Sequence, residues 1–366
     1  MVADKSLMNQ GAIKEFLTPK YIVALVAIIA LAVLVVTKGS SSTYVFFVAC
    51  LALVPLAGII GQSTEMLAER TGPKVGGFLN ATLGNAAELI IAFVALKNGY
   101  ITLAKASIIG SAVGNLLLVL GLAMLMGGLR HGRQQLDKES AKHYATMLIT
   151  VVILFSIPTI AKYTGGVSRS GLHTISLGLA IGMLLVYAMG MYYTFKTSAA
   201  PLARRSAEGG HKIWSVAKAG AILAVSTILV VVISEILVSS IKPVLKSFPG
   251  MGVFFVGFII IPIVGNVAEH FVAVQVSHKN NDMSLSMEVA VGSSLQILLL
   301  VAPLLVIAGL LMGKRLDLTF NLIEWAALIG SCVIVSRVSS DGETNYFEGG
   351  TLVILYAMIA WVFYVM

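Results

Sequence analysis

The chain has 366 residues, of which 58% are apolar and only 11% charged, and its mean hydropathy is +0.94. Soluble domains carry about 25% charged residues, so this composition excludes an ordinary soluble enzyme or nucleic-acid-binding protein. It predicts a multi-pass protein of the lipid bilayer. The net charge of +8 fits basic loops on the cytoplasmic side of a membrane. The two cysteines, each inside an apolar run, lack the spacing of a metal site or a disulfide scaffold.

Eleven apolar runs are long enough to cross a bilayer, which requires about 20 residues per helix. They lie at 21–37, 44–62, 75–96, 101–128, 144–163, 172–195, 213–240, 251–276, 285–312, 316–335 and 351–366. The linkers are short and polar, and residues 1–20 lack the apolar core of a removable signal peptide. We therefore expect an all-α integral membrane protein with eleven transmembrane helices.

An internal repeat divides the chain. The run Gly84-Asn85-Ala86-Ala87-Glu88 recurs as Gly265-Asn266-Val267-Ala268-Glu269, at an offset of 181, and Asn115 and Gln296 share that offset. We expect two five-helix repeats, at 44–195 and 213–366, joined by a central cytoplasmic linker at 196–212. Residues 1–43 would hold an N-terminal segment and one extra helix. Because five is odd, the repeats must enter the membrane from opposite sides, as in many secondary transporters.

The loop charges predict an orientation. With a cytoplasmic N-terminus, the cytoplasmic segments carry 16 of the 25 Lys and Arg residues and the opposite face carries 9. Cytoplasmic loops are enriched in these residues. The N-terminus is therefore expected in the cytoplasm and the C-terminus outside.

The third predicted span contains one acid, Glu88, and the eighth contains one, Glu269. A carboxylate at mid-membrane is costly unless it is paired, hydrated or neutralised, so it indicates a functional site. Each follows an asparagine by three residues, Asn85 or Asn266, which places both side chains on one helical face. The glycine before each asparagine weakens the helix, and Pro262 adds a kink to the second copy. Broken helices expose carbonyl oxygens that bind cations. In the alternative interpretation, the acid lies near the headgroups and the amide only bridges two helices. That would not explain why the same pair recurs at the equivalent position of the second repeat.

The donor set indicates the ligand. Carboxylates, amides, hydroxyls and freed carbonyls are hard oxygen donors, and Ca²⁺ takes 6–8 of them in flexible geometry. No cysteine or histidine cluster favours a softer metal, and no resident cofactor is expected, since Ca²⁺ would be the transported substrate. Once the ion leaves, burial and mutual repulsion favour protonation of Glu88 and Glu269. Protons and Ca²⁺ would then compete for the same two carboxylates.

Other polar residues in these spans are open to two interpretations. Ser111, Asn115, Ser293 and Gln296 either support the metal ligands or make ordinary hydrogen bonds between helices. His270 either relays protons or packs in the core. Three further acids, Glu65, Glu235 and Glu288, are interpreted as charges near helix ends, although the first two could also attract cations or conduct protons.

The motif runs resemble a known family. They are TGPKVGG at 71–77, LNATLGNAAELI at 79–90 and PIVGNVAEH at 262–270, supported by residues 110–121 and 292–296. Together they resemble the cation/proton exchangers (Ca²⁺/H⁺ antiporters) of the Ca²⁺/cation antiporter superfamily. The resemblance covers both repeats.

The resemblance implies a Ca²⁺ site centred on Glu88 and Glu269, with supporting roles for Asn85, Asn266, Ser293 and Gln296. It implies proton-coupled export of Ca²⁺ from the cytosol by alternating access. The compact loops favour a bacterial cell membrane. The expected partners are Ca²⁺, H⁺ and the lipid bilayer, without nucleic acid, and a homo-oligomer remains open.

Three rival functions fit the sequence less well. A Na⁺/Ca²⁺ exchanger of the same superfamily would hold several cations and more acidic ligands than Glu88 and Glu269. An intramembrane metalloenzyme is opposed by Asn266, which stands where an H-x-x-E-H zinc motif needs histidine. A channel is opposed by two trapped carboxylates, which would bind Ca²⁺ too firmly for fast flow unless several sites lie in file. Transport, and no enzymatic activity, is therefore expected.

Overall fold

The computed structural model describes residues 19–39, 42–71, 79, 82–197, 214–248 and 250–366, and this part of the chain is almost entirely helical. Eight of its helices are long and apolar enough to cross a membrane, or nine if one bent pair is counted as a span. The fold class is thus all-α, as predicted. The expected N-terminal segment and most of the central linker fall outside the described residues.

The helices follow the predicted runs. The first half contains α2 (Pro19–Lys38), α3 (Thr43–Thr71), α5 (Ala86–Lys97), α6 (Ile101–Val113), the π-helical turn η1 (Gly114–Val119), α7 (Leu120–His131), α8 (Lys138–Tyr163) and α9 (Arg169–Thr197). The second half begins with α11 (Val216–Ser239), α12 (Ile241–Ser247), α13 (Val253–Phe255), η2 (Val256–Ile260) and α14 (Ile261–Asn280). It continues with α15 (Met283–Met287), η3 (Glu288–Gly292), α16 (Ser293–Gln296), η4 (Ile297–Val301), α17 (Ala302–Leu311), α18 (Leu322–Val338) and α19 (Tyr346–Val365).

Two of the eleven expected spans fall short of a full crossing among the described residues. Helix α5 has 12 residues and α18 has 17. Residues 72–78 and 80–81, which precede α5 in the third predicted span, are outside the described part of the chain.

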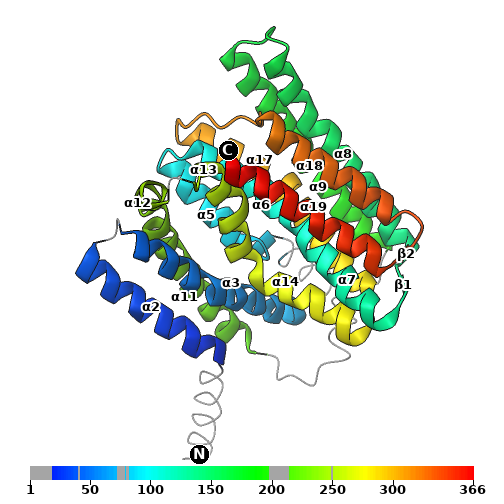
Figure 1. The fold of residues 1–366 in the computed structure, drawn as a ribbon, viewed down its shortest axis with the longest axis horizontal. Coiled ribbons are helices and arrows are strands. Elements are labelled where there is room, and N and C mark those ends of the chain that lie inside the picture. The colour runs from blue at the N-terminus through cyan, green and yellow to red at the C-terminus, as the bar shows by residue number, and fades with distance from the viewer. Residues whose placement is uncertain (1–18, 40–41, 72–78, 80–81, 198–213, 249) are drawn as a thin grey trace, which may run out of the picture.

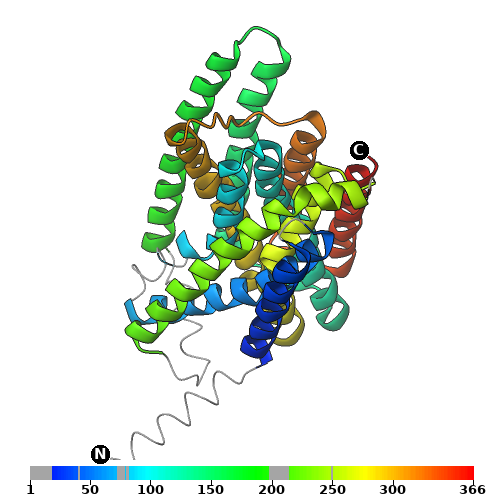
Figure 2. The same cartoon turned by 90° about the vertical axis from the view of Figure 1, so that its left-hand side faces the viewer.

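The centre of the molecule is formed by one span from each half. The segment from α6 to α7 is 83% buried in its most apolar window and the segment from α15 to α17 is 61% buried, whereas α2 is only 11% buried. Helix α3 packs against α2 and α11. The α8–α9 hairpin projects from the body at the side away from α2 (Figures 1 and 2).

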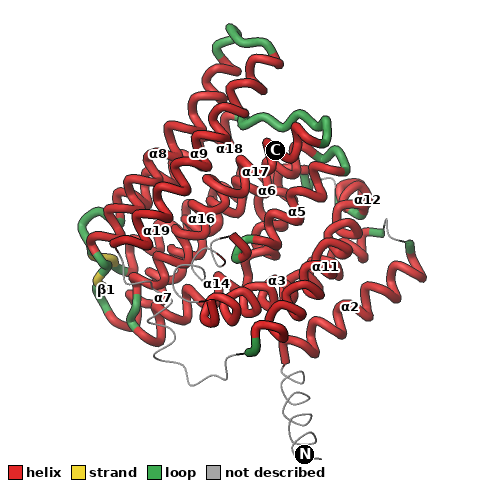
Figure 3. The backbone as a smooth tube through the Cα atoms, turned by 180° about the vertical axis from the view of Figure 1, so that it is seen from behind, coloured by secondary structure: helices red, strands yellow, loops and turns green. Residues whose placement is uncertain are grey.

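A small strand pair joins the two halves, which sequence reasoning did not predict. Strand β1 (Gln134–Gln135) follows α7 and pairs antiparallel with β2 (Glu343–Thr344), which precedes α19. It lies at the edge of the bundle beside α7 and α19 (Figure 3). Two residues are too few to give a strand pattern in the sequence.

Both motif spans are interrupted at the motif. Helix α5 begins at Ala86, directly after a turn at Gly84 and Asn85. In the second half the segments 253–267 and 269–280 are bent by 63° relative to each other. This bend lies between Asn266 and Glu269 and not at Pro262, where we expected the kink; the π-helical turn η2 instead precedes that proline.

Candidate functional site

Asn85 is the centre of a buried hydrogen-bond network between the two halves. Its Nδ2 donates to Gln296 Oε1 at 2.6 Å, and its Oδ1 accepts from Ser293 Oγ at 2.8 Å. Asn115 Nδ2 donates to the same Ser293 oxygen at 3.1 Å. Asn85 is 2% exposed, so these bonds form where water does not compete with them. Four of the predicted residues are therefore in one network.

Glu88 lies one turn further along α5 and faces the second half. A methyl group built on Gly265 would lie 3.2 Å from Glu88 Oε1, so the carboxylate rests against the backbone of the second motif. Glu88 also lines a narrow cavity, with room for about one water molecule, together with Ser107, Ser111 and Gly265. The missing side chain of Gly265 is what allows this approach.

The two motif acids are close enough for their charges to interact. The carboxyl group of Glu269 lies near Ser293, a member of the Asn85 network. Both acids are only partly exposed. Two adjacent, poorly solvated carboxylates without a counter-charge are unfavourable, so this arrangement favours a cation or protons.

Several oxygens and nitrogens beside the network have no hydrogen-bond partner among the described residues. They are Nδ2 and Oδ1 of Asn266, Oε2 of Glu269, Oδ1 of Asn115 and Nε2 of His270. Asn266 is 1% exposed. Buried polar groups are almost always paired, and an exception calls for an ion, water or a functional role. The oxygens among these atoms have lone pairs that no donor in the described residues uses.

The donor chemistry of the site suits a hard cation. Carboxylate, amide and hydroxyl oxygens from α5, α14 and α16 meet there, and such oxygens are the ligands of Ca²⁺. Within the described residues, no group of three or more His, Cys, Asp or Glu side chains is placed to hold a metal ion. A site for a softer transition metal is therefore not supported by this donor set.

Three other acids, Glu65, Glu235 and Glu288, lie outside the cavity beside Glu88. Glu235 accepts from Lys97 Nζ at 2.6 Å and from Asn98 Nδ2 at 2.8 Å near the end of α11. Glu288 opens η3 and interacts with Tyr144 of α8. Glu65 lies on α3. None of the three lines the cavity beside Glu88.

Sequence reasoning missed Ser107 as a residue of the site. It is buried and lines the cavity of Glu88 together with Ser111. A signal was present, because the two serines are four residues apart on α6 and therefore share one helical face. Ser107 Oγ donates to the carbonyl oxygen of Ala104 at 3.0 Å, which leaves its lone pairs available for the cavity.

Comparison with protein families gives one match to most of the chain. The family model described as "Sodium/calcium exchanger protein" matches residues 41–196 and again residues 218–365. Each of the two matched segments contains one copy of the Gly-Asn-x-Ala-Glu motif.

Similar proteins are known. The chain is 43% identical over 341 residues to a Ca(2+)/H(+) antiporter of Aphanothece halophytica, which covers 87% of this chain and 90% of that protein. It is 38% identical over 324 residues to the Ca(2+)/H(+) antiporter ChaA of Bacillus subtilis (strain 168), an alignment that covers 87% of this chain and 91% of that protein. A solved structure described as native YfkE superposes with a TM-score of 0.82 at 35% identity, covering 95% of this chain and 100% of that one.

Proposed function

This chain belongs to the sodium/calcium exchanger protein family, and on that premise we propose that it exchanges Ca²⁺ for protons across a membrane. It is a secondary transporter and not an enzyme. The relatives that share 38–43% of its residues are named Ca(2+)/H(+) antiporters, in agreement with the resemblance of the motifs. The export of Ca²⁺ from the cytosol by alternating access is part of the proposal.

The proposal rests on the meeting of Glu88 and Glu269. They come from equivalent positions in the two halves and interact in a poorly solvated centre. Two negative charges match one Ca²⁺ ion or two protons, so either substrate neutralises the site. Burying an unpaired charge is costly, and the protein changes its facing only when the site is neutral. This requirement couples the two fluxes.

The proposed Ca²⁺ site includes the atoms that lack partners. Asn266 and Glu269 supply oxygens that nothing else in the described structure engages, and Glu88 supplies the second carboxylate. Asn85 and Ser293 hold the other side of the site through their mutual hydrogen bond. Gln296, Asn115 and Ser111 support these residues from the adjoining turns, and His270, whose Nε2 has no partner among the described residues, is the nearest candidate for proton relay. No resident cofactor is needed, because Ca²⁺ is the substrate.

Eleven spans and two inverted repeats complete the proposal. The two family matches, at 41–196 and 218–365, support halves near 44–195 and 213–366. Helices α5 and α18 would complete the count, with α2 as the extra helix. The excess of Lys and Arg in alternate loops supports a cytoplasmic N-terminus and an external C-terminus. A bacterial cell membrane is the proposed location, in line with the bacterial relative ChaA.

Uptake of Ca²⁺ into proteoliposomes tests the function. An imposed pH gradient should drive uptake by the wild-type chain and a Na⁺ gradient should not. Glu88→Gln and Glu269→Gln should each lower uptake at least about tenfold, since a neutral amide cannot balance a divalent charge or exchange a proton. The matched control is Glu343→Gln, at a half-exposed acid on β2. Uptake driven by a Na⁺ gradient would show that Na⁺, and not the proton, is the coupling ion. Full activity in both site variants would refute the assignment of the site.

A further inference from the structure

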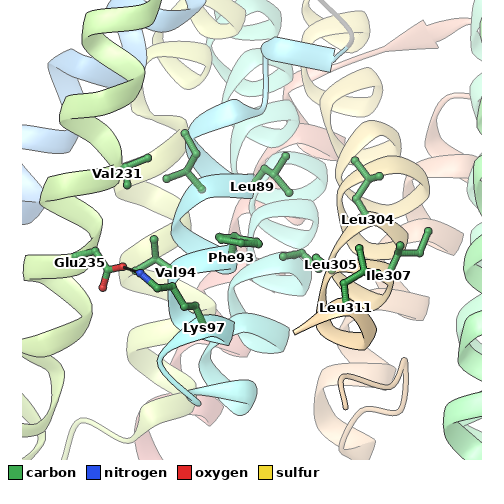
Figure 4. Close-up of a pocket in the computed structure, with 12 residues that line it drawn as sticks. Leu89, Phe93, Val94, Lys97, Val231, Glu235, Leu304, Leu305, Ile307 and Leu311 are labelled. Carbon is green, nitrogen blue, oxygen red and sulfur yellow. Dashed lines mark hydrogen bonds and ion pairs between the residues drawn. The ribbon is translucent and has the colours of Figure 1, made fainter. Parts of the chain in front are cut away.

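A groove outside the cation site lies between α5, α11 and α17. It encloses about 510 Å³, within the range of pockets that hold small ligands. Phe93 forms part of its floor on α5, with Val231 and Glu235 of α11 on one side and α17 on the other (Figure 4). The residues contributed by α17 are Leu304, Leu305, Ile307, Ala308 and Leu311.

The groove is apolar except at one end. Apart from Lys97 and Glu235, every lining residue is a hydrocarbon or aromatic side chain. Such walls do not provide a path for Ca²⁺ or protons, which need polar groups. Phe93 is 38% exposed and Leu311 is 82% exposed, so the opening meets the lipid that surrounds a membrane helix. The groove is therefore built for hydrocarbon.

The polar end lies where a lipid headgroup would be. Helix α5 ends at Lys97, and the chain turns through Gly99, with a φ of 82°, before α6 begins. From Lys97 the groove runs along α5 to Leu89, which is about 12 Å at 1.5 Å per residue. Leu89 is next to Glu88 of the cation site. The groove thus changes from charged to apolar from the helix end inward, as a phospholipid does from its phosphate to its chains.

The charged end offers a donor for a phosphate. Lys97 bonds to Glu235 at 2.6 Å, yet its side chain is 59% exposed and its ammonium group has two further N–H donors. Long lysine side chains at helix ends reach to the membrane interface in this way. Glu235 is held in turn by Asn98 Nδ2 at 2.8 Å.

We propose that this groove binds one bilayer phospholipid, with an acyl chain between α5, α11 and α17 and its phosphate on Lys97. The occupant would contact α5, the helix that carries Glu88, and α11, which packs on α3. The lipid would then fill the space between α11 and α17, beside the direct contact of α11 with α5. This inference needs only that the protein lies in a bilayer, and it does not depend on which ions are exchanged.

Native mass spectrometry of the purified full chain in detergent, titrated with phosphatidylglycerol, tests the proposal. Wild type should retain one such lipid, and diacylglycerol with the same chains but no phosphate should be retained about tenfold less, the loss of one charge-assisted hydrogen bond. Leu304→Trp, which fills the groove, should abolish retention. Leu185→Trp is its control, the same change at a 62% exposed, lipid-facing position of α9.

Two charge variants separate phosphate binding from a structural ion pair. Lys97→Ala should lower retention about tenfold, because it removes the donor and leaves Glu235 facing the phosphate. Glu235→Gln should raise retention, because it releases Lys97. The control for lysine removal is Lys38→Ala at the exposed end of α2. A merely structural pair would make both groove variants behave alike, and that result, or retention unchanged in Leu304→Trp, would overturn the proposal.

Discussion

Asn85 and Asn266 occupy equivalent positions of the two motifs, yet their truncation should have different effects on stability. Asn85 makes two hydrogen bonds, to Gln296 and Ser293, whereas Asn266 makes none with the described residues. Both are buried, at 2% and 1% exposed. Changing each to alanine removes the same atoms, so cavity effects largely cancel in the comparison. Asn85 precedes the first residue of α5 whereas Asn266 lies inside α14, so helix propensity favours alanine only at position 266 and adds to the difference in the same direction.

The expected difference follows from the number of bonds. Each buried hydrogen bond contributes about 1 kcal/mol net, so Asn85→Ala should cost about 2 kcal/mol more than Asn266→Ala. With an unfolding entropy of roughly 2 cal/mol/K per residue, this difference lowers the unfolding midpoint of a chain of this length by about 3 °C. Asn266→Ala should be close to neutral, because it removes two unpaired polar atoms.

Thermal unfolding of the purified chain, in Ca²⁺-free buffer with a chelator, measures the difference. Transport in proteoliposomes is the second readout, and there both variants should be impaired, since both asparagines belong to the proposed site. An equal fall in the unfolding midpoint, or a larger one for Asn266→Ala, would refute the reasoning from the hydrogen-bond network.

Two further predictions concern the packing of the site and a partly buried ion pair. Gly265→Ala should raise the Ca²⁺ concentration for half-maximal transport several-fold, because its methyl group would press on the Glu88 carboxylate at 3.2 Å, while Gly182→Ala in α9, with open space around it, should not. Burial opposes the charge of Asp317, but its bonds to Lys105 and Thr319 outweigh this effect and hold its pKa below the usual 3.8. The folding stability of wild type should therefore fall as the pH drops below about 3.8, and this dependence, followed by chemical unfolding against pH, should be weaker in Asp317→Asn.

The helices could largely be predicted from the sequence, because lipid requires long apolar runs with satisfied backbones. The tenth span shows where this fails. It was expected to begin at 316, but α18 begins at Leu322. Leu316, Leu318 and Phe320 are only 1–2% exposed, although they lie in a non-helical segment. Lys105 stabilises this segment by an ion pair with Asp317 and a hydrogen bond to the carbonyl oxygen of Thr319. Asn321 then caps the helix. An apolar run predicts burial, but the tertiary contacts determine whether its backbone is helical.

The sequence predicted which residues form the candidate site, but it did not predict how they are hydrogen-bonded. The repeat offset alone paired Glu88 with Glu269 and Asn85 with Asn266, and the structure brings the two halves together at these residues. Which asparagine is hydrogen-bonded was not predictable, because both motifs read alike and the difference arises from neighbours 211 and 208 residues away. The position of the bend was also predicted wrongly: we expected it at Pro262, but it lies between residues 267 and 269, beside Glu269.

The difference between the two motifs bears on how such a protein would work. Similar sequences here adopt two arrangements: a turn at Gly84 and Asn85 with the amide hydrogen-bonded to the other half, and a bent helix at Asn266 with the amide free of described partners. In an inverted repeat, exchanging the arrangements of the halves turns a site that opens to one side of the membrane into one that opens to the other. The two states would be close in energy because each breaks and makes a similar network. Under the proposed function, the charge on Glu88 and Glu269 then decides when the exchange of arrangements takes place, since an unneutralised pair would oppose it.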